Sequence, residues 1–410
     1  MKIWKQYQAL RGQREFGKLV AADAVNRFGD SIDAIAMSLL MYEITGSAAM
    51  MSLVLGLNYL PNILLQPIFG VWVEKRNKRR IMFATDFARG AVVLMMAALY
   101  RMGHMNTGWL LAATLTLSTL EAFRLPAGTA LTPQLLAREH YTVGASLRGG
   151  ISRLMEIGGL ALGGAVTAVL GIQGALAIDA ATFLISGVLI AWIGVQEEKG
   201  GAVTNWNALK SGLNEGVRYL TGNSLLVAMF LLGMALNFCL VPVSSLGTAY
   251  LVEVLGHGAA FLSAVQLVQV AGMAVGSTVV PLLSRFKRWS LIVAAGLVGC
   301  LALAALGPAA VLAGWPRDAV VLAAMALLGA SVGMQSVLYS AAFLEHVDQG
   351  FLARVGGLTD SLLYMAMPLG AFLCSALAAS LSIPMVFAMA GGLMAAAYGV
   401  MCCLRVYRSL

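Results

Sequence analysis

The chain has 410 residues, of which 60% are hydrophobic and 11% are charged, and its formal net charge is +8 at pH 7. Soluble globular proteins carry roughly 25% charged residues, so this composition excludes an ordinary cytosolic enzyme. Apolar stretches long enough to cross a bilayer core recur along the whole sequence. The predicted fold class is therefore an all-α polytopic membrane protein.

In chain order, turn residues and charges delimit twelve predicted transmembrane helices. The first six span approximately 17–43, 47–73, 80–101, 106–128, 143–170 and 172–195. The second six span approximately 223–253, 258–284, 289–313, 317–343, 352–380 and 383–406. Loops on one side hold nearly all the lysines and arginines, so the positive-inside rule predicts that both termini and these loops are cytoplasmic.

This orientation explains the basic excess, and no nucleic-acid partner is expected. The N-terminal segment lacks a short apolar core followed by a cleavage site, so no signal peptide is expected. The five cysteines lie in apolar spans and the four histidines in separate loops, so neither a disulfide framework nor a metal site is expected. The chain has no phosphate-loop, dinucleotide-binding or nucleophile-elbow motif. An ion gradient is therefore the expected energy source. We expect neither a cofactor nor an enzymatic activity.

The hydrophilic segment 196–222 divides the chain into two predicted six-helix bundles, 1–195 and 223–410. Apolar residues at helical spacing within "TNWNALKSGLNEGVRYL" predict an amphipathic helix on the cytoplasmic membrane surface, with a flexible linker as the alternative. The halves also share a short similarity, "GGISRLM" at 149–155 and "GGLTDSLL" at 356–363, which would place Arg153 opposite Asp360.

Several segments carry recognisable signatures. "GVWVEKRNKRR" (70–80) has a glycine, an acid four residues on, and then a basic run, with Glu74 where Asp is usual and Asn77 where Gly is usual. "LEAFRLPAG" (120–128) is built around Arg124, and "GGLALGG" (158–164) has Leu160 where proline is usual. With these segments the chain resembles the major facilitator superfamily over essentially its full length. "NRFGDSID", "YEITGSA", "LPAGTALTPQL" and "AIDAATFLISG" resemble its macrolide-efflux and enterobactin-exporter branch.

This resemblance implies a fold of two pseudo-symmetric six-helix bundles. It also implies alternating access and the export of hydrophobic or amphipathic small molecules in exchange for protons. The alternatives are a siderophore exporter, a lipid or lysolipid flippase and an uptake symporter. The expected protein is a monomer in the inner (cytoplasmic) membrane, in contact with membrane lipid.

Ionisable residues inside membrane spans are costly and usually face a cavity or a partner. The first half holds most of them, whereas the second half clearly holds only Asp360, with Arg354 near a helix boundary. We therefore expect the first half to couple ion movement and the second half to bind an apolar substrate.

Asp30 and Asp33, near the middle of the first span, are the leading candidates for proton coupling, followed by Glu156 in the fifth span. Asp33 has no partner on its own helix, and an unpaired carboxylate in a low-dielectric site can bind a proton near neutral pH. The alternative is a structural role, in ion pairs with arginines of neighbouring helices: Arg124, Arg148 and Arg153.

Asp23 and Arg27 stand four residues apart nearer the cytoplasm and are predicted to form an ion pair. Glu74 is predicted to join a gate network that reaches Asp86 or Arg89, the alternative being a basic loop beside lipid headgroups. The other predicted members of the charge network are Arg79, Glu121, Arg124, Arg153 and Asp360. Asp179, in contrast, is predicted to serve helix packing.

The second half offers weakly polar side chains as substrate-binding candidates: Asn237, Gln266, Gln269, Gln335, Tyr339 and Tyr364. The alternative for the amides is hydrogen bonding between helices. The 22 methionines are candidates for an adaptable cavity lining or, alternatively, for gap filling between helices.

Overall fold

The computed structural model describes residues 9–45, 48–195, 206–257, 259–378 and 380–404, and within these ranges it is helical with no strand. The long helices are α2 (Arg14–Thr45), α3 (Ala48–Glu74), α4 (Lys78–Arg101), α5 (Thr107–Leu135), α6 (Tyr141–Ala191), α7 (Trp206–Gly222), α8 (Ser224–Ala249), α9 (Ala259–Val279), α10 (Arg288–Ala309), α11 (Trp315–His346), α12 (Leu352–Ala378) and α13 (Ile383–Cys403).

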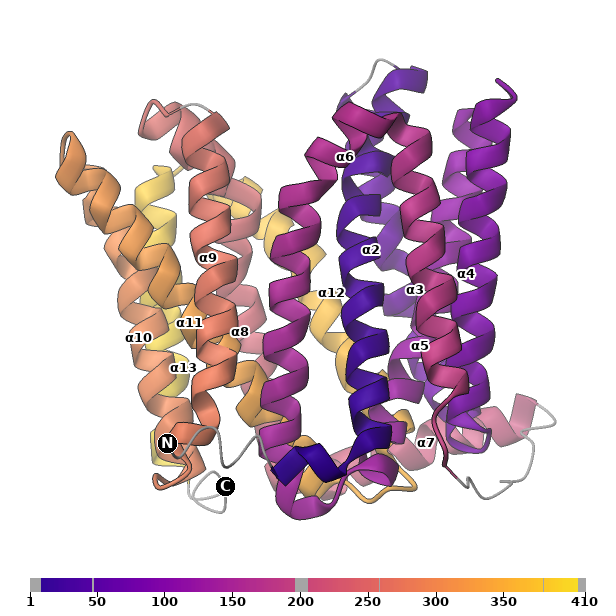
Figure 1. The fold of residues 1–410 in the computed structure, drawn as a ribbon. Helices are drawn as coiled ribbons and strands as arrows, with labels where there is room; N and C mark the ends of the chain where they lie inside the picture. The colour runs from indigo at the N-terminus through magenta and orange to yellow at the C-terminus, as the bar shows by residue number, and fades with distance from the viewer. Residues whose placement is uncertain (1–8, 46–47, 196–205, 258, 379, 405–410) are drawn as a thin grey trace.

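Helices α2–α6 form one group and helices α8–α13 form a second group, with α12 lying between the two (Figure 1). Helix α6 contains two spans, because Gly171 (φ 70°, ψ 177°) breaks it and reverses the chain. Only glycine adopts this backbone conformation readily. The break lies at the predicted boundary between the fifth and sixth spans.

With α6 counted as two spans and α7 set apart, the described helices correspond to the twelve predicted spans. Seven segments are long and apolar enough to cross a membrane by length and composition. Helix α2 is outside this set and carries the charges of "AADAVNRFGDSID". The end of the molecule that carries the loop 75–77 and the start of α10 is called the basic end below.

The fourth predicted span ends too early. The sequence analysis stopped it at residue 128, whereas α5 continues through Pro126 and Pro133 to Leu135. Threonine hydroxyls bond to backbone carbonyls in this region, with Thr132 Oγ1 donating to Gly128 O at 2.8 Å. Such side-chain bonds and close helix packing offset the backbone bonds that proline removes in membrane helices.

Helix α7 is the predicted amphipathic helix, but one face of it packs on protein. Gly212 lies against Val71 of α3, and Gly216 lies against Arg354 and Leu358 of α12. Its Tyr219 ring stacks on Phe351 with the ring centroids 4.3 Å apart. Helix α7 therefore bridges α3 of the first group and α12 of the second.

The two similar glycine pairs in the sequence both lie where the groups meet. A Cβ atom on Gly150 of α6 would lie 2.6 Å from Thr278 Cγ2 of α9. On Gly357 of α12 it would lie 2.5 Å from the Gln66 carbonyl oxygen of α3. The repeat that the sequence suggested thus forms two corresponding cross-group contacts, α6 with α9 and α3 with α12.

Within the second group, α9 and α11 approach through glycines on both helices. A Cβ on Gly272 would lie 2.2 Å from the Ala326 carbonyl oxygen, and a Cβ on Gly329 would lie 2.0 Å from the Gln269 carbonyl oxygen. Because glycine has no side chain, the two helix backbones can approach this closely, and close approach of this kind stabilises helix association in membranes.

Gly329→Ala should destabilise the purified protein, by about 1–3 kcal/mol, because its methyl group forces two helix backbones apart. Gly392→Ala is the matched control, since no atom lies within 4 Å of a Cβ at that position on α13. Thermal unfolding in detergent measures both variants. Equal melting temperatures for the two would contradict the α9–α11 packing described here.

Candidate binding cavity and charged network

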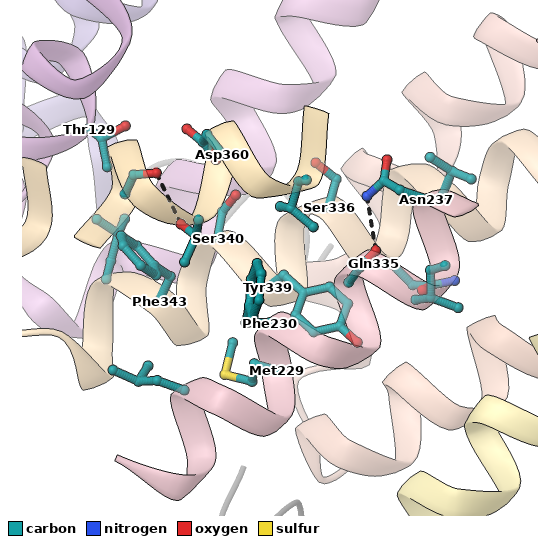
Figure 2. A pocket seen from close by; sticks show the side chains of 18 of the residues that line it. Thr129, Met229, Phe230, Asn237, Gln335, Ser336, Tyr339, Ser340, Phe343 and Asp360 are labelled. Carbon is teal, nitrogen blue, oxygen red and sulfur yellow. Dashed lines mark hydrogen bonds between the residues drawn. The ribbon is translucent and has the colours of Figure 1, made fainter. Parts of the chain in front are cut away.

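Two adjoining cavities lie where the helical groups meet. The larger, of about 490 Å³, is surrounded by side chains from α5, α8, α11 and α12 (Figure 2). The smaller, of about 250 Å³, is bordered by ionisable side chains of the first group and by α11, and is called the charged pocket. The two cavities share a rim formed by Thr132, Arg148, Ser336, Ser340 and Leu344.

Three of the six predicted substrate-binding residues line the larger cavity: Asn237, Gln335 and Tyr339. Phe230 and Met229 of α8, which the sequence analysis did not single out, face the same space. Gln335 is held within the second group, because it donates to Ser331 Oγ at 2.8 Å and accepts a hydrogen bond from Tyr398.

The other three predicted substrate-binding residues line neither cavity. The Gln269 backbone packs against Gly329 at the α9–α11 crossing. The Tyr364 ring lies 6.2 Å from the Tyr59 ring, between α12 and α3. Gln266 is exposed on α9.

Asp23 pairs with two arginines of neighbouring helices, so the predicted Asp23–Arg27 pair is wrong. Its Oδ1 lies 3.0 Å from an Arg124 terminal nitrogen, and its Oδ2 accepts from Arg148 Nε at 2.6 Å. The Arg27 side chain instead faces the charged pocket and has no ion pair within the described ranges. Although Asp23 and Arg27 lie four residues apart on one helix, the Asp23 carboxylate pairs with arginines of two other helices, Arg124 and Arg148.

Asp86 and Arg89 lie deep in the first group, beyond the reach of Glu74. The Asp86 side chain is fully buried, accepting from Arg124 Nε at 2.6 Å and Ser186 Oγ at 2.7 Å. Arg89 donates to Asp30 Oδ1 at 2.8 Å and lies over the Phe183 ring. The predicted link from Glu74 to either residue is therefore wrong.

The three acids predicted for proton coupling have different surroundings. Asp30 is paired with Arg89, and Glu156 is paired with Arg153 at 2.6 Å. Asp33 Oδ1 is buried with no hydrogen-bond partner in the part of the chain that the structure describes. Their roles in proton movement stay predictions.

Glu74 pairs across the groups with Arg354, which the sequence analysis left outside the network. The buried Arg354 guanidinium donates to both Glu74 oxygens, at 2.9 and 3.2 Å, and to Glu215 of α7 at 2.8 Å. The hydrogen bond from Arg354 holds the pKa of Glu215 below its ordinary value, so this carboxylate stays ionised at neutral pH. One arginine of the second group thereby joins α3, α7 and α12.

The remaining predicted network residues have other partners. Arg79 donates to the Ile193 carbonyl oxygen at the end of α6. Asp360 accepts from Gln66 Nε2 at 3.2 Å and borders the larger cavity, so Arg153 and Asp360 do not pair. Glu121 borders the charged pocket.

A second cross-group contact at the basic end involves Glu345 of α11. Within the second group, Arg288 of α10 binds the Glu345 carboxylate through two hydrogen bonds of 2.8 Å. Arg138, from the loop between α5 and α6, donates to the carbonyl oxygen of the same glutamate. The two groups are therefore joined at the basic end through Arg354 and through Glu345.

Comparisons with known proteins give a consistent result. The family model of the Major Facilitator Superfamily matches residues 19–371. Macrolide efflux protein A of Streptococcus pyogenes is 24% identical over 387 residues, covering 92% of this chain and 93% of that protein. Multidrug efflux pump Tap of Mycobacterium bovis is 25% identical over 364 residues, covering 85% of this chain and 83% of that protein.

Solved structures support the same fold. A bacterial homologue of the iron transporter ferroportin superposes with a TM-score of 0.76 at 15% identity, covering 96% of this chain and 98% of that one. The E. coli fucose:proton symporter FucP gives 0.73 at 13% identity, covering 96% and 97%. These likenesses confirm the predicted all-α fold of two six-helix bundles.

Arg354→Gln should open the basic end, because it leaves Glu74 without its cation, and breaking a buried pair costs about 3–5 kcal/mol. Spin labels at positions 76 and 350, measured by double electron–electron resonance, should report a longer or broader distance distribution. The matched control is Glu139→Gln, which removes a largely exposed acid at the same end. An unchanged distribution in Arg354→Gln would contradict this role.

Proposed function

The chain belongs to the Major Facilitator Superfamily, and from this premise we propose that it exports hydrophobic or amphipathic small molecules of the drug and macrolide type in exchange for protons. Two relatives that align over most of the chain are named for macrolide and multidrug efflux. The basic end is then the cytoplasmic end, in line with the positive-inside rule.

The observation that carries this proposal is the adjacency of the two cavities. The larger cavity presents Phe230, Met229 and Tyr339, together with a few hydroxyl and amide groups. Sites for apolar small molecules combine such walls with a small number of polar groups. The charged pocket beside it is lined by Asp23, Asp30 and Glu121, and Arg148 lines both cavities.

Alternating access would follow from the cross-group contacts. The bundles 1–195 and 223–410 would rock about the α6–α9 and α3–α12 interfaces, where glycines allow close sliding contact. Opening toward the cytoplasm requires the Glu74–Arg354 pair and the Arg138–Glu345 contact to break. A bound substrate or proton shifts this equilibrium only by its difference in affinity for the two states.

Proton coupling is placed in the first group, with Asp33 as the leading carrier. Asp30 and Glu156 each have an arginine to neutralise them, whereas Asp33 has none within 4 Å among the described residues. Binding a proton removes the cost of a buried charge without moving a helix. Asp30, which is bound to Arg89, would change the electrostatic potential at Asp33 and thereby the affinity of Asp33 for a proton.

Purified protein in liposomes with an acidic lumen should accumulate a permanently charged lipophilic dye, because protons leaving the lumen drive the dye inward. Collapse of the pH gradient should abolish accumulation, and Asp33→Asn should abolish it with the gradient intact. Asp30→Asn should also reduce it, since Arg89 loses its partner. Accumulation that is insensitive to the gradient and to both substitutions would rule out proton antiport.

Phe230→Ala should weaken binding of bulky apolar compounds about tenfold, the effect of losing one buried aromatic contact. Leu231→Ala is the matched control, because the next residue of α8 is exposed on the outside and lines neither cavity. Competition for dye transport measures both. Equal effects would place the binding site elsewhere, and competition by a siderophore or lysolipid alone would assign another substrate class.

A further inference from the structure

Asp179 of α6 is a buried acid without a cation. Its side chain has no exposed surface, and its Oδ1 lies 3.5 Å from Thr182 Oγ1. Its Oδ2 is buried with no hydrogen-bond partner among the described residues. Packing alone does not explain this group, because a buried polar atom without a partner is costly and rare.

Asp179 lies directly against α2 at the level of the proposed proton carrier. A Cβ on Gly29 would lie 2.6 Å from Asp179 Oδ1, so the absent side chain makes room for the carboxylate. Asp33 stands one helical turn further along α2 on the same face, and side chains on helices lean back toward the preceding turn. Asp33 Oδ1 is likewise buried with no hydrogen-bond partner among the described residues.

The charges around this pair leave it uncompensated. The groups that act on Asp179 are Asp33 and Asp30 of α2 and Arg89 of α4. Arg89 is already bound to Asp30 at 2.8 Å. Neither Asp33 nor Asp179 has an arginine, lysine or histidine within 4 Å in the described part of the chain.

Away from the ends of its spans, the first half contains more acids than bases. These positions hold seven acids, Asp23, Asp30, Asp33, Asp86, Glu121, Glu156 and Asp179, and five arginines, Arg27, Arg89, Arg124, Arg148 and Arg153. Glu121 and Arg27 border the charged pocket, and the carboxylates that act on Arg27 are those of Asp30, Glu121 and Glu156. The ion pairs account for the other four arginines. Asp33 and Asp179 therefore have no ion pair among the described residues.

We propose that Asp33 and Asp179 form one proton-binding site, in which the two carboxylates share the transported proton. Two neighbouring carboxylates in a buried site do not both ionise, and the pair takes up and releases its proton as a unit. This assignment rests on the proposed proton antiport and adds its second carboxylate.

A series of contacts runs from Arg89, whose charge acts on the pair, to the larger cavity. Arg89 donates to Asn26 at 3.4 Å, and Asn26 donates to Asp86 at 3.4 Å. Asp86 binds Arg124, and Arg124 and Arg148 both bind Asp23. Loss of the shared proton would draw Arg89 toward the new charge and change its contact with Asn26. The effect would reach Arg148 at the rim of the larger cavity.

Infrared difference spectroscopy of the full-length protein in liposomes tests the site, because protonated and ionised carboxyl groups absorb separately. Raising the pH should remove a carboxylic-acid C=O band in the unmodified protein. Asp33→Asn and Asp179→Asn should each abolish this band, since both carboxylates hold the same proton. Glu43→Gln, an acid-to-amide change at the far end of α2, should leave it unchanged.

Transport gives a second readout. Asp179→Asn should lose gradient-driven accumulation but retain exchange of dye for dye, which needs a folded carrier and no net proton movement. If Asp179→Asn does not fold, Thr182→Val serves instead. It removes only the hydroxyl beside Asp179 and should shift the C=O band.

These experiments distinguish failure of the shared carboxylate site from failure of the proposed proton antiport. A band lost in Asp33→Asn but retained in Asp179→Asn, or full gradient-driven accumulation by Asp179→Asn, would overturn the shared site and leave proton antiport intact. An unmodified protein that ignores the pH gradient would overturn the proposed function. Accumulation driven by a sodium gradient at equal pH would replace the proton by sodium.

Discussion

The cost of an ionised carboxylate in a low-dielectric interior is the constraint on which the first half of the molecule depends. Most of its intramembrane acids meet that cost through a short contact with an arginine of the same or a neighbouring helix. Asp23 takes two arginines, and Asp86 takes an arginine and a serine hydroxyl. Among the described residues, Asp33 and Asp179 have no cation within 4 Å, and we propose that a proton neutralises them.

The second half meets different requirements. Its helices approach closely at glycines, and the larger cavity has apolar walls with few charges. The rim that the cavities share, which includes Arg148, brings the two environments together. At the basic end, Arg354 joins three helices, one of them α7, which lies within the segment 196–222 between the halves. In the proposed function, substrate binding, ion coupling and closure of the basic end thus use separate residues.

Helix number, span order and the break near residue 171 followed from the sequence, because hydropathy and glycine act locally. The asymmetry of charge between the halves did as well. The ion-pair partners of the buried acids did not follow from the sequence. Asp23 was assigned to Arg27 on its own helix, and Glu74 was assigned to Asp86 or Arg89 on the next helix. Both acids bind arginines distant in sequence, Arg148 and Arg354, whose proximity depends on how the helices pack. Asp179 was assigned to packing because a lone acid in "AIDAATF" does not reveal that it lies against Gly29 of α2.

The central claim is that substrate and proton exclude one another through connected sites. Its most direct test is proton release on substrate binding, recorded with a pH-sensitive dye in weakly buffered detergent solution. The account predicts that a saturating apolar cation releases protons from the unmodified protein near neutral pH and that Asp33→Asn releases none. Tight binding without proton release across that pH range, by a protein that still exports the compound, would contradict it.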